Sequence, residues 1–129
     1  MATAQVVTIT EYNGFPGIKK IVWSWKSTDL GVVTGAVTDN KYTGELIRFI
    51  TDPGATAPTA DYDVTILDSD LTDVLIGAGA DRHTSTTQQV IASSLGCVYD
   101  STLTLEIEHA GDAKLGTVYL YIKDISERR

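Results

Sequence analysis

Residues 49–82 read FITDPGATAPTADYDVTILDSDLTDVLIGAGADR. In the middle of this stretch, Tyr62, Val64 and Ile66 alternate with residues that face the other way. A period of two is the pattern of a β-strand with one face in a core. A loop rich in proline, alanine and threonine precedes this strand, and a loop rich in glycine and alanine follows it. The stretch therefore predicts a β-protein with long loops.

The rest of the chain repeats this pattern of alternating or β-branched residues. Strands are predicted at Gln5–Tyr12, Ile18–Thr28, Val32–Thr38, Tyr42–Thr51, Tyr62–Asp68, Val74–Ile76, Gln88–Ala92, Thr102–His109 and Thr117–Lys123. Gly35 and Gly44 lie inside two of these segments and indicate bulges or a close approach of the backbone. No segment keeps a helical period for three turns.

With Gln88–Ala92 as no more than a brief strand, these segments amount to about eight short strands separated by turn residues, which predict an all-β fold. We expect one domain over residues 1–129, built as a single antiparallel β-sandwich or a jelly-roll-like barrel. Residues 1–12 are expected to be an edge strand or an N-terminal arm. The last two strands are predicted to form a hairpin, and their core residues are Leu103, Leu105, Ile107, Val118, Leu120 and Ile122. Alternation does not specify strand order, so jelly-roll and immunoglobulin-like topologies both stay open.

Composition and charge narrow the classes of partner. The chain has 129 residues, 43% of them hydrophobic, and can bury a core without disulfides. Its net charge of −7 argues against nucleic acid as a direct ligand, because phosphate binding needs clustered Lys and Arg. The Lys19–Lys20 pair is expected to protect a solvated strand edge. No apolar run approaches the ~20 residues of a membrane span and the first residues show no secretory signal, so no membrane partner is expected.

No arrangement of residues points to catalysis. The chain has two histidines, His83 and His109, and one cysteine, Cys97. It lacks paired cysteines and an HExxH pattern, which argues against zinc, and it lacks a Gly-x-Ser-x-Gly nucleophile elbow. Cys97 is expected to be a small buried hydrophobic residue. We therefore expect no enzyme activity, no catalytic residue, no metal and no cofactor.

Three carboxylates, at Asp68, Asp70 and Asp73, fall within one predicted turn. Calcium sites need several oxygens that converge from a loop. This run lacks the glycine and the distal glutamate of an EF-hand loop. Asp and Ser are also the residues that β-turns favour. A solvated turn is therefore preferred, and calcium binding stays open as the alternative.

Two pairs of aromatic residues suggest different environments. Trp23 and Trp25 share one face of a strand, which favours a core pair, with a sugar-stacking platform as the alternative. Tyr119 and Tyr121 lie opposite the core residues of the last strand and are predicted to be exposed. Exposed neighbouring tyrosines are typical of protein interfaces. The tyrosines therefore indicate assembly with other proteins.

The pattern ITDPGATAPTADYDVTILDSD…TDVLIGAGADR, followed by STLTLEIEHAGDAKLGTVYLYIK, resembles a family of small structural proteins of tailed bacteriophages. The resemblance covers roughly residues 49–123 and leaves the first 48 residues unplaced. It implies a component of the phage particle, assembled in the host cytoplasm. Leu71 departs from the pattern, because a turn-forming glycine is expected there, and this leaves the turn type open.

The resemblance and the surface pattern together give the expected function. We expect a homo-oligomeric, non-enzymatic capsid decoration or cement protein that binds other copies of itself and the major capsid protein. A head–tail joining or tail protein is the first alternative, and a carbohydrate-binding β-sandwich that uses Trp23 and Trp25 is the second. The segment Ala2–Thr10 is expected to complete a neighbour's sheet. The predicted partner-binding residues are Asp52, Pro53, Pro58, Asp81, Arg82, His83, Tyr119 and Tyr121.

Overall fold

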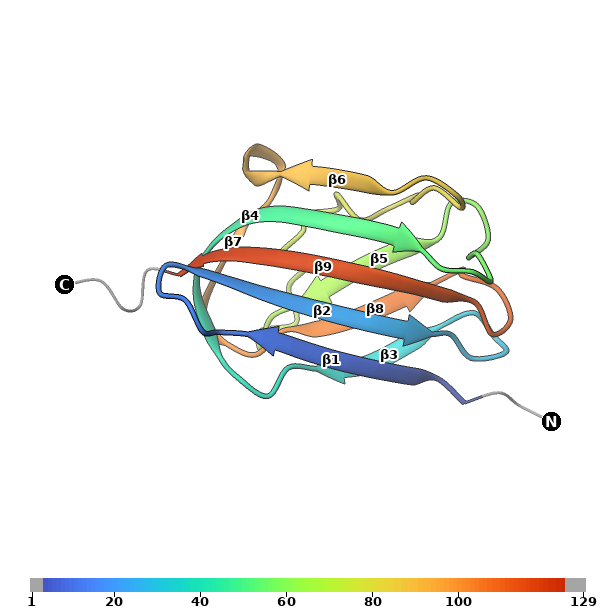
Figure 1. The fold of residues 1–129 in the computed structure, drawn as a ribbon, viewed down its shortest axis with the longest axis horizontal. Helices are drawn as coiled ribbons and strands as arrows, with labels where there is room; N and C mark the ends of the chain where they lie inside the picture. Colours follow the sequence, from blue (N-terminus) through green and yellow to red (C-terminus); the bar gives the residue numbers. More distant parts are fainter. Residues whose placement is uncertain (1–3, 125–129) are drawn as a thin grey trace.

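The computed structural model describes residues 4–124, and it places them in two antiparallel sheets that pack face to face (Figure 1). The strands are β1 (Val6–Tyr12), β2 (Ile18–Lys26), β3 (Val33–Val37), β4 (Tyr42–Pro53), β5 (Asp63–Leu67), β6 (Gln88–Ile91), β7 (Cys97–Ser101), β8 (Thr104–Glu108) and β9 (Leu115–Asp124), with a 3₁₀ turn η1 (Ala92–Ser94) between β6 and β7. The predicted all-β, sandwich-like fold is confirmed, with nine strands in place of about eight.

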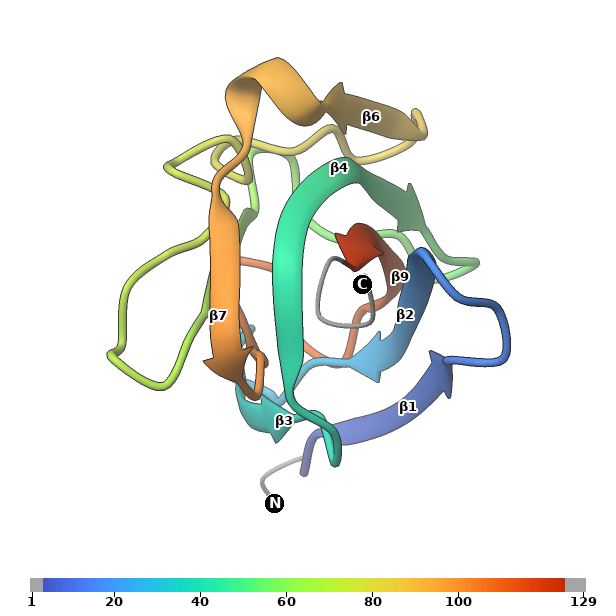
Figure 2. The ribbon, with the colours of Figure 1, turned by 90° about the vertical axis from the view of Figure 1, so that its left-hand side faces the viewer.

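The large sheet has the order β1-β2-β9-β4-β6, and β7 also pairs with β4. β4 is 12 residues long and bends strongly along its length (Figure 2). Its first residues pair with β7 and its last with β6, so these two strands follow one edge of β4 in succession. A Cβ atom at Gly44 would collide with the carbonyl oxygen of Lys123. The predicted close approach at Gly44 is confirmed, and so is an irregularity around Gly35, where the register shifts between Val33 and Ala36.

The small sheet has the order β3-β8-β5, and the core lies between the two sheets. Tyr62, Val64 and Ile66 point into this core, as their alternation predicts. The core residues predicted for the last two strands have no exposed surface: Leu103, Leu105, Ile107, Val118, Leu120 and Ile122. Trp23 and Phe49 of the large sheet are equally buried. Burial of a large apolar side chain stabilises the fold by about 1.5–3 kcal/mol.

The predicted hairpin of the last two strands is wrong. β8 pairs with β3 and β5 in the small sheet, whereas β9 pairs with β2 and β4 in the large sheet. The connection at residues 109–114 therefore crosses from one sheet to the other. Alternation identifies the inward side of a strand, but both sheets of a sandwich have an inward side. The pattern could not say to which sheet each strand belongs.

The segment Val74–Ile76 forms a turn and not the predicted strand. The Asp73 carboxylate explains the turn, since it accepts hydrogen bonds from the backbone N–H groups of Ile66, Leu75 and Gly77. These bonds replace the ladder that a strand would form. Leu75 is nevertheless fully buried, so its apolar character reflects the core and not a strand.

Strand β7 has no counterpart among the predicted strands, because only Val98 and Ser101 of its five residues are buried. Cys97 begins this strand and is exposed, so the expectation of a buried cysteine is wrong. Among the described strands, β7 pairs only with β4. A side chain on such an edge strand is covered less than one on a central strand.

A glutamine side chain joins the two sheets where β1 lies beside β3. Gln5 Nε2 donates to the carbonyl oxygen of Thr34 at 2.7 Å, and Thr34 N donates to Gln5 Oε1 at 2.8 Å. The side-chain amide thus offers a donor and an acceptor to the edge of β3, as the backbone of an added strand would. The two bonds satisfy groups that an edge strand otherwise leaves unpaired.

The burial of Leu105 generates the first prediction. Replacing Leu105 by Ala should lower the free energy of unfolding by about 2–5 kcal/mol, because the change leaves a cavity between the sheets. Denaturant unfolding followed by tryptophan fluorescence measures the difference. The matched control is Glu108→Ala, an exposed position on the same strand, which should change stability by less than about 0.5 kcal/mol. A loss near zero at Leu105 would place this face of β8 outside the core.

The backbone at Leu71 generates the second prediction. Leu71 has φ = 63°, in the left-handed region, and its side chain is 78% exposed. This conformation costs an L-residue roughly 1–2 kcal/mol, and glycine avoids most of that cost. Leu71→Gly should therefore raise the free energy of unfolding by about 0.5–1 kcal/mol after the entropy cost of glycine. Leu71→Ala, which keeps the strain, should show no such gain, and an equal gain in both variants would contradict the argument.

Candidate functional site

The outer face of the large sheet carries a cluster of aromatic and basic side chains. We call it the aromatic face, and it consists of Tyr12, Phe15, Ile18, Lys20, Arg48, Tyr119 and Tyr121. On β2 and β9, the alternation that sends Trp23 and Leu120 into the core sends Lys20 and Tyr121 outward. Core packing on one side of the sheet therefore fixes which residues appear on the other.

The strand register aligns four of these residues in one row. Lys20 is the register partner of both Tyr12 on β1 and Tyr121 on β9, and Tyr121 is the register partner of Arg48 on β4. Arg48 faces outward because β4 has an irregularity between Leu46 and Arg48, which reverses its alternation. The row therefore reads Tyr, Lys, Tyr, Arg across four strands. Residues far apart in the sequence meet here.

Cation–π contacts hold the row together. The Lys20 ammonium lies 5.4 Å from the ring centroid of Tyr12 and 5.5 Å from those of Tyr119 and Tyr121. The Arg48 guanidinium lies 5.4 Å from the ring of Tyr121. Contacts of this length are attractive, each by about 0.5–1 kcal/mol at an exposed site. Within residues 4–124, no carboxylate lies in ion-pair distance of Lys20.

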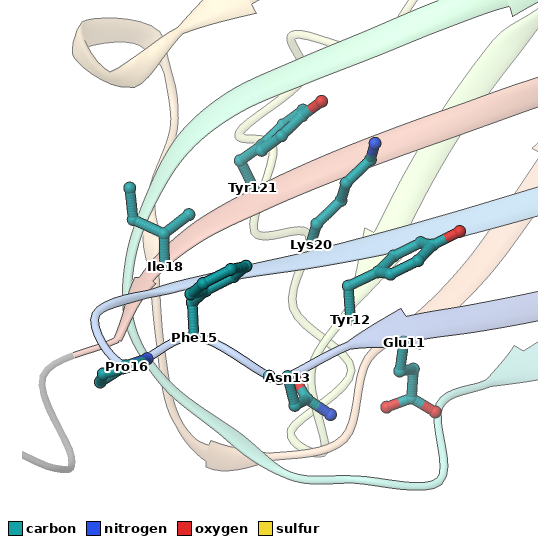
Figure 3. Close-up of a pocket in the computed structure, with 9 residues that line it drawn as sticks. Glu11, Tyr12, Asn13, Phe15, Pro16, Ile18, Lys20 and Tyr121 are labelled. Carbon is teal, nitrogen blue, oxygen red and sulfur yellow. The ribbon is translucent and has the colours of Figure 1, made fainter.

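A groove of about 730 Å³ opens at one end of the aromatic face, beside the β1–β2 hairpin (Figure 3). Tyr12, Phe15, Ile18, Lys20 and Tyr121 project into it from the same side of the sheet. Phe15 is 80% exposed, which is unusual for a phenylalanine in a folded protein. A concave apolar surface of this kind is typical of binding sites.

A buried lysine fixes the hairpin that bears Phe15. Lys19 points inward, is only 6% exposed, and donates to the carbonyl oxygens of Asn13 and Phe15 at 3.2 and 3.3 Å. Its ammonium also lies 3.9 Å from the Asp124 carboxylate. The expectation that Lys19 and Lys20 protect a solvated edge is wrong, because β2 lies between β1 and β9. Lys19 instead anchors the turn, and Lys20 belongs to the aromatic face.

Glu11 ties the groove end of β1 to the turn after β3. Its carboxylate accepts hydrogen bonds from the N–H groups of Asp39 and Asn40, from the Asn40 amide and from the Tyr42 hydroxyl at 2.6 Å. Burial alone would raise the pKa of Glu11, but the hydrogen bonds from Tyr42, Asp39 and Asn40 together lower it. Burial first, and then the bond to Glu11, raise the pKa of Tyr42. Both effects favour a charged Glu11 bound to a neutral Tyr42.

The predicted contact residues on the last strand lie as expected. Tyr119 and Tyr121 point outward and are partly exposed. Asp52 and Pro53 end β4, also partly exposed, and Asp52 accepts a hydrogen bond from the Thr87 hydroxyl at 3.0 Å. Their positions leave these side chains accessible to a partner.

Two of the predicted contact residues are not accessible. Pro58 is buried in its loop, and Arg82 is 7% exposed. The Arg82 guanidinium donates to the carbonyl oxygen of Ala78 at 3.1 Å and lies 5.8 Å from the ring of Phe49. The side chains of Pro58 and Arg82 are therefore not available to a partner, because they support the loops from within.

The neighbours of Arg82 are exposed, and their contacts are local. Asp81 donates its backbone N–H to the Asp63 carboxylate at 3.0 Å. His83 Nδ1 accepts hydrogen bonds from the N–H groups of Ser85 and Thr86. These contacts order the loop, and they leave the Asp81 side chain free to meet a partner.

The turn with three carboxylates uses two of them to bind its own backbone. Asp68 Oδ1 accepts from the N–H groups of Asp70 and Thr72 at 2.9 and 3.0 Å. Asp73 accepts backbone hydrogen bonds with both of its oxygens. Within residues 4–124, no three His, Cys, Asp or Glu side chains gather closely enough to hold a metal ion. These contacts favour the solvated turn over the calcium alternative.

The small sheet carries an acid–base pair on its outer face. His109 Nδ1 lies 2.8 Å from Asp63 Oδ2, and this contact raises the pKa of His109. The Asp81 N–H and His109 lower the pKa of Asp63. No hydroxyl or thiol of the described residues hydrogen-bonds to His109.

The two tryptophans are buried. Trp23 is fully buried and Trp25 is 2% exposed, with its ring centroid 5.8 Å from that of Tyr62. The preferred interpretation of a core pair is confirmed. A sugar-binding platform made of these two residues is ruled out in the folded chain.

Comparison of the chain with protein-family models, with curated proteins and with solved structures gives no significant match. In the part of the chain that the structure describes, no helix has the length and apolar character to cross a membrane.

The hydrogen bonds of Glu11 generate the third prediction. Because its folded-state pKa lies below the ordinary value of 4.5, the charged carboxylate stabilises the fold at neutral pH. This stabilisation is lost as the pH falls below 4.5 and through the folded-state pKa. Glu11→Gln should therefore be less stable than the original protein at pH 7, and the difference should shrink toward pH 3. Denaturant midpoints across this range measure it, with Glu108→Gln as the exposed control, and a pH-independent difference would contradict the linkage.

Proposed function

We propose that this protein is a non-enzymatic structural component of a tailed-phage particle, which decorates or reinforces the capsid through its aromatic face. The single observation that carries the proposal in the structure is the Tyr12–Lys20–Tyr121–Arg48 row beside an open groove. Tyrosine and arginine are enriched in protein interfaces, and exposed phenylalanine is rare elsewhere. The row therefore supports a role in binding another protein.

The resemblance to phage structural proteins, which covers residues 49–123 and so includes Tyr121, supports the same proposal. Its residues build the end of β4, β5, the loop up to Arg82, and β8 with β9. Several of them hold the fold, as Arg82 and Asp73 do, so the resemblance speaks for a shared architecture. Tyr12, Phe15 and Lys20 lie outside the resembling region. The unplaced N-terminal part therefore supplies much of the surface that selects the partner.

The N-terminal segment forms β1, which lies at the edge of the large sheet. Val6–Tyr12 pairs with β2 along its whole length, and Val7 and Ile9 pack against the core. Because β1 lies at the edge of the large sheet, its outer edge can still add to a neighbour's sheet while its inner edge stays paired with β2. Ala2 and Thr3 lie outside the described residues. The segment also presents Tyr12 at the groove.

Assembly on a particle requires only moderate affinity from the aromatic face of each copy. Each copy fixed at several points on a shell is held more tightly than one contact would hold it. A head–tail joining or tail protein would use the aromatic face in the same way, around a different axis. Imaging of particles with this protein labelled separates shell, neck and tail directly.

The fourth prediction tests the face. Tyr121→Ala should reduce co-sedimentation of the protein with phage particles at least tenfold, because it removes the ring shared by Lys20 and Arg48. The matched control is Tyr99→Ala, which removes a tyrosine that is 84% exposed on β7, outside the aromatic face. It should bind normally. Equal binding by both variants, with both folded, would exclude the aromatic face, and label found only at the tail would exclude decoration of the shell.

A further inference from the structure

The shape and charge of the groove set two requirements for a molecule that binds there. Its walls are apolar, formed by Tyr12, Phe15 and Ile18, whereas Lys20 at its side brings a positive charge that no carboxylate of the described residues neutralises. Glu11 also borders the groove, but its carboxylate points away and is taken up by the turn after β3. A suitable occupant therefore has an apolar tip beside an acidic side chain.

The chain itself carries such a tip, in the turn after β5. Leu71 is 78% exposed at the end of this turn and next to Asp70. The turn is rigid, because Asp68 N donates to Thr72 O, Leu71 N donates to Asp68 O, and the Asp68 carboxylate accepts two further backbone bonds. Within residues 4–124, the Asp70 carboxylate makes no hydrogen bond or ion pair.

The hydrogen bonds of the turn hold the backbone of Leu71 in a left-handed conformation, and its side chain lies mostly in solvent. Its φ of 63° is unfavourable for leucine, and the exposed side chain gains nothing from packing in the monomer. A large apolar residue kept at a strained turn tip is what a contact with another surface would explain.

From this complementarity of shape and charge we infer that the groove receives the Asp68–Asp73 turn of a second copy of the chain. Leu71 enters between Tyr12, Phe15 and Ile18, and Asp70 lies toward Lys20. The inference deepens the proposed function and rests on it for the role of the aromatic face in assembly. It names a second copy as a partner of that face.

The contact is heterologous. The groove belongs to the β1–β2 side of the large sheet, whereas the turn follows β5 of the small sheet. Two different surfaces therefore meet. After the first contact one copy still has a vacant turn and the other a vacant groove. Such contacts build rings or open chains of copies and not a closed symmetric dimer. Opposite charges at the two surfaces also steer the copies together although the whole chain is negative.

Mixing two variants tests the inference with the full chain. Lys20→Glu reverses the charge at the groove but keeps the turn, and Leu71→Asp removes the apolar tip but keeps the groove. Each variant alone should be monomeric by light scattering and sedimentation, whereas the original protein should form larger species as its concentration rises. An equimolar mixture should give a 1:1 heterodimer of doubled mass and nothing larger, because one intact groove and one intact turn remain.

Leu30→Asp is the matched control. Leu30 is 81% exposed in another turn, next to Asp29, and its loss should leave self-association unchanged. If Lys20→Glu weakens the fold, as its melting temperature would show, Lys20→Met takes its place, because methionine keeps the apolar chain and removes only the charge. Lys20→Met alone should associate more weakly than the original protein.

The outcomes separate this inference from the proposed function. Three outcomes would each overturn the inference. The original protein could stay monomeric up to its solubility limit, the two folded variants could fail to pair, or association could be lost in Leu30→Asp but not in Leu71→Asp. If the original protein does not self-associate in this way but still binds particles through Tyr121, the proposed function stands without the inference. Self-association that follows the predicted pattern, in a protein that does not bind particles, would support the inference and remove the phage role.

Discussion

The register between β2, β9 and β4 is the constraint on which both the core and the aromatic face depend. Because side chains alternate, a slip of one residue would bring Lys20 and Tyr121 into the core and expose Trp23 and Leu120. The close approach of Lys123 at Gly44 helps to hold β4 and β9 in place. The irregularity before Arg48 lets β4 bury Phe49 and still place a guanidinium outside. Buried area between the sheets therefore stabilises the surface arrangement as well as the interior.

Local pattern predicts this molecule well wherever a strand has one inward face. Tyr62–Ile66 and the core residues of β8 and β9 follow from alternation alone. The pattern does not predict how strands pair with one another. It does not assign β8 and β9 to different sheets. It also cannot align Lys20 with Tyr121, which lie 101 positions apart in the chain. It also fails at Val74–Ile76, where the Asp73 carboxylate competes with strand formation.

The candidate site was only partly visible in the sequence for the same reason. Tyr121 could be identified because it alternates with the inward-facing residues of a clearly alternating strand. Phe15 looks like an ordinary turn residue, and its exposure depends on Lys19, a buried cation that sequence patterns assign to the surface. Arg82 shows the reverse error, since a charged residue in a polar loop is expected outside but here lies over Phe49. Charged residues with long aliphatic chains are the ones for which burial depends most on tertiary contacts.

The hydrogen bonds between Gln5 and Thr34 make the contact between the two sheets sensitive to deamidation of Gln5. Deamidation converts a glutamine side chain to a carboxylate, which can accept hydrogen bonds but cannot donate them. At Gln5 the change would set a carboxylate oxygen against the carbonyl oxygen of Thr34, where an N–H now donates. The donor at Thr34 N would keep its acceptor, so the seam between β1 and β3 would loosen on one side only. Ageing at this single amide would therefore weaken the join between the two sheets without touching the core.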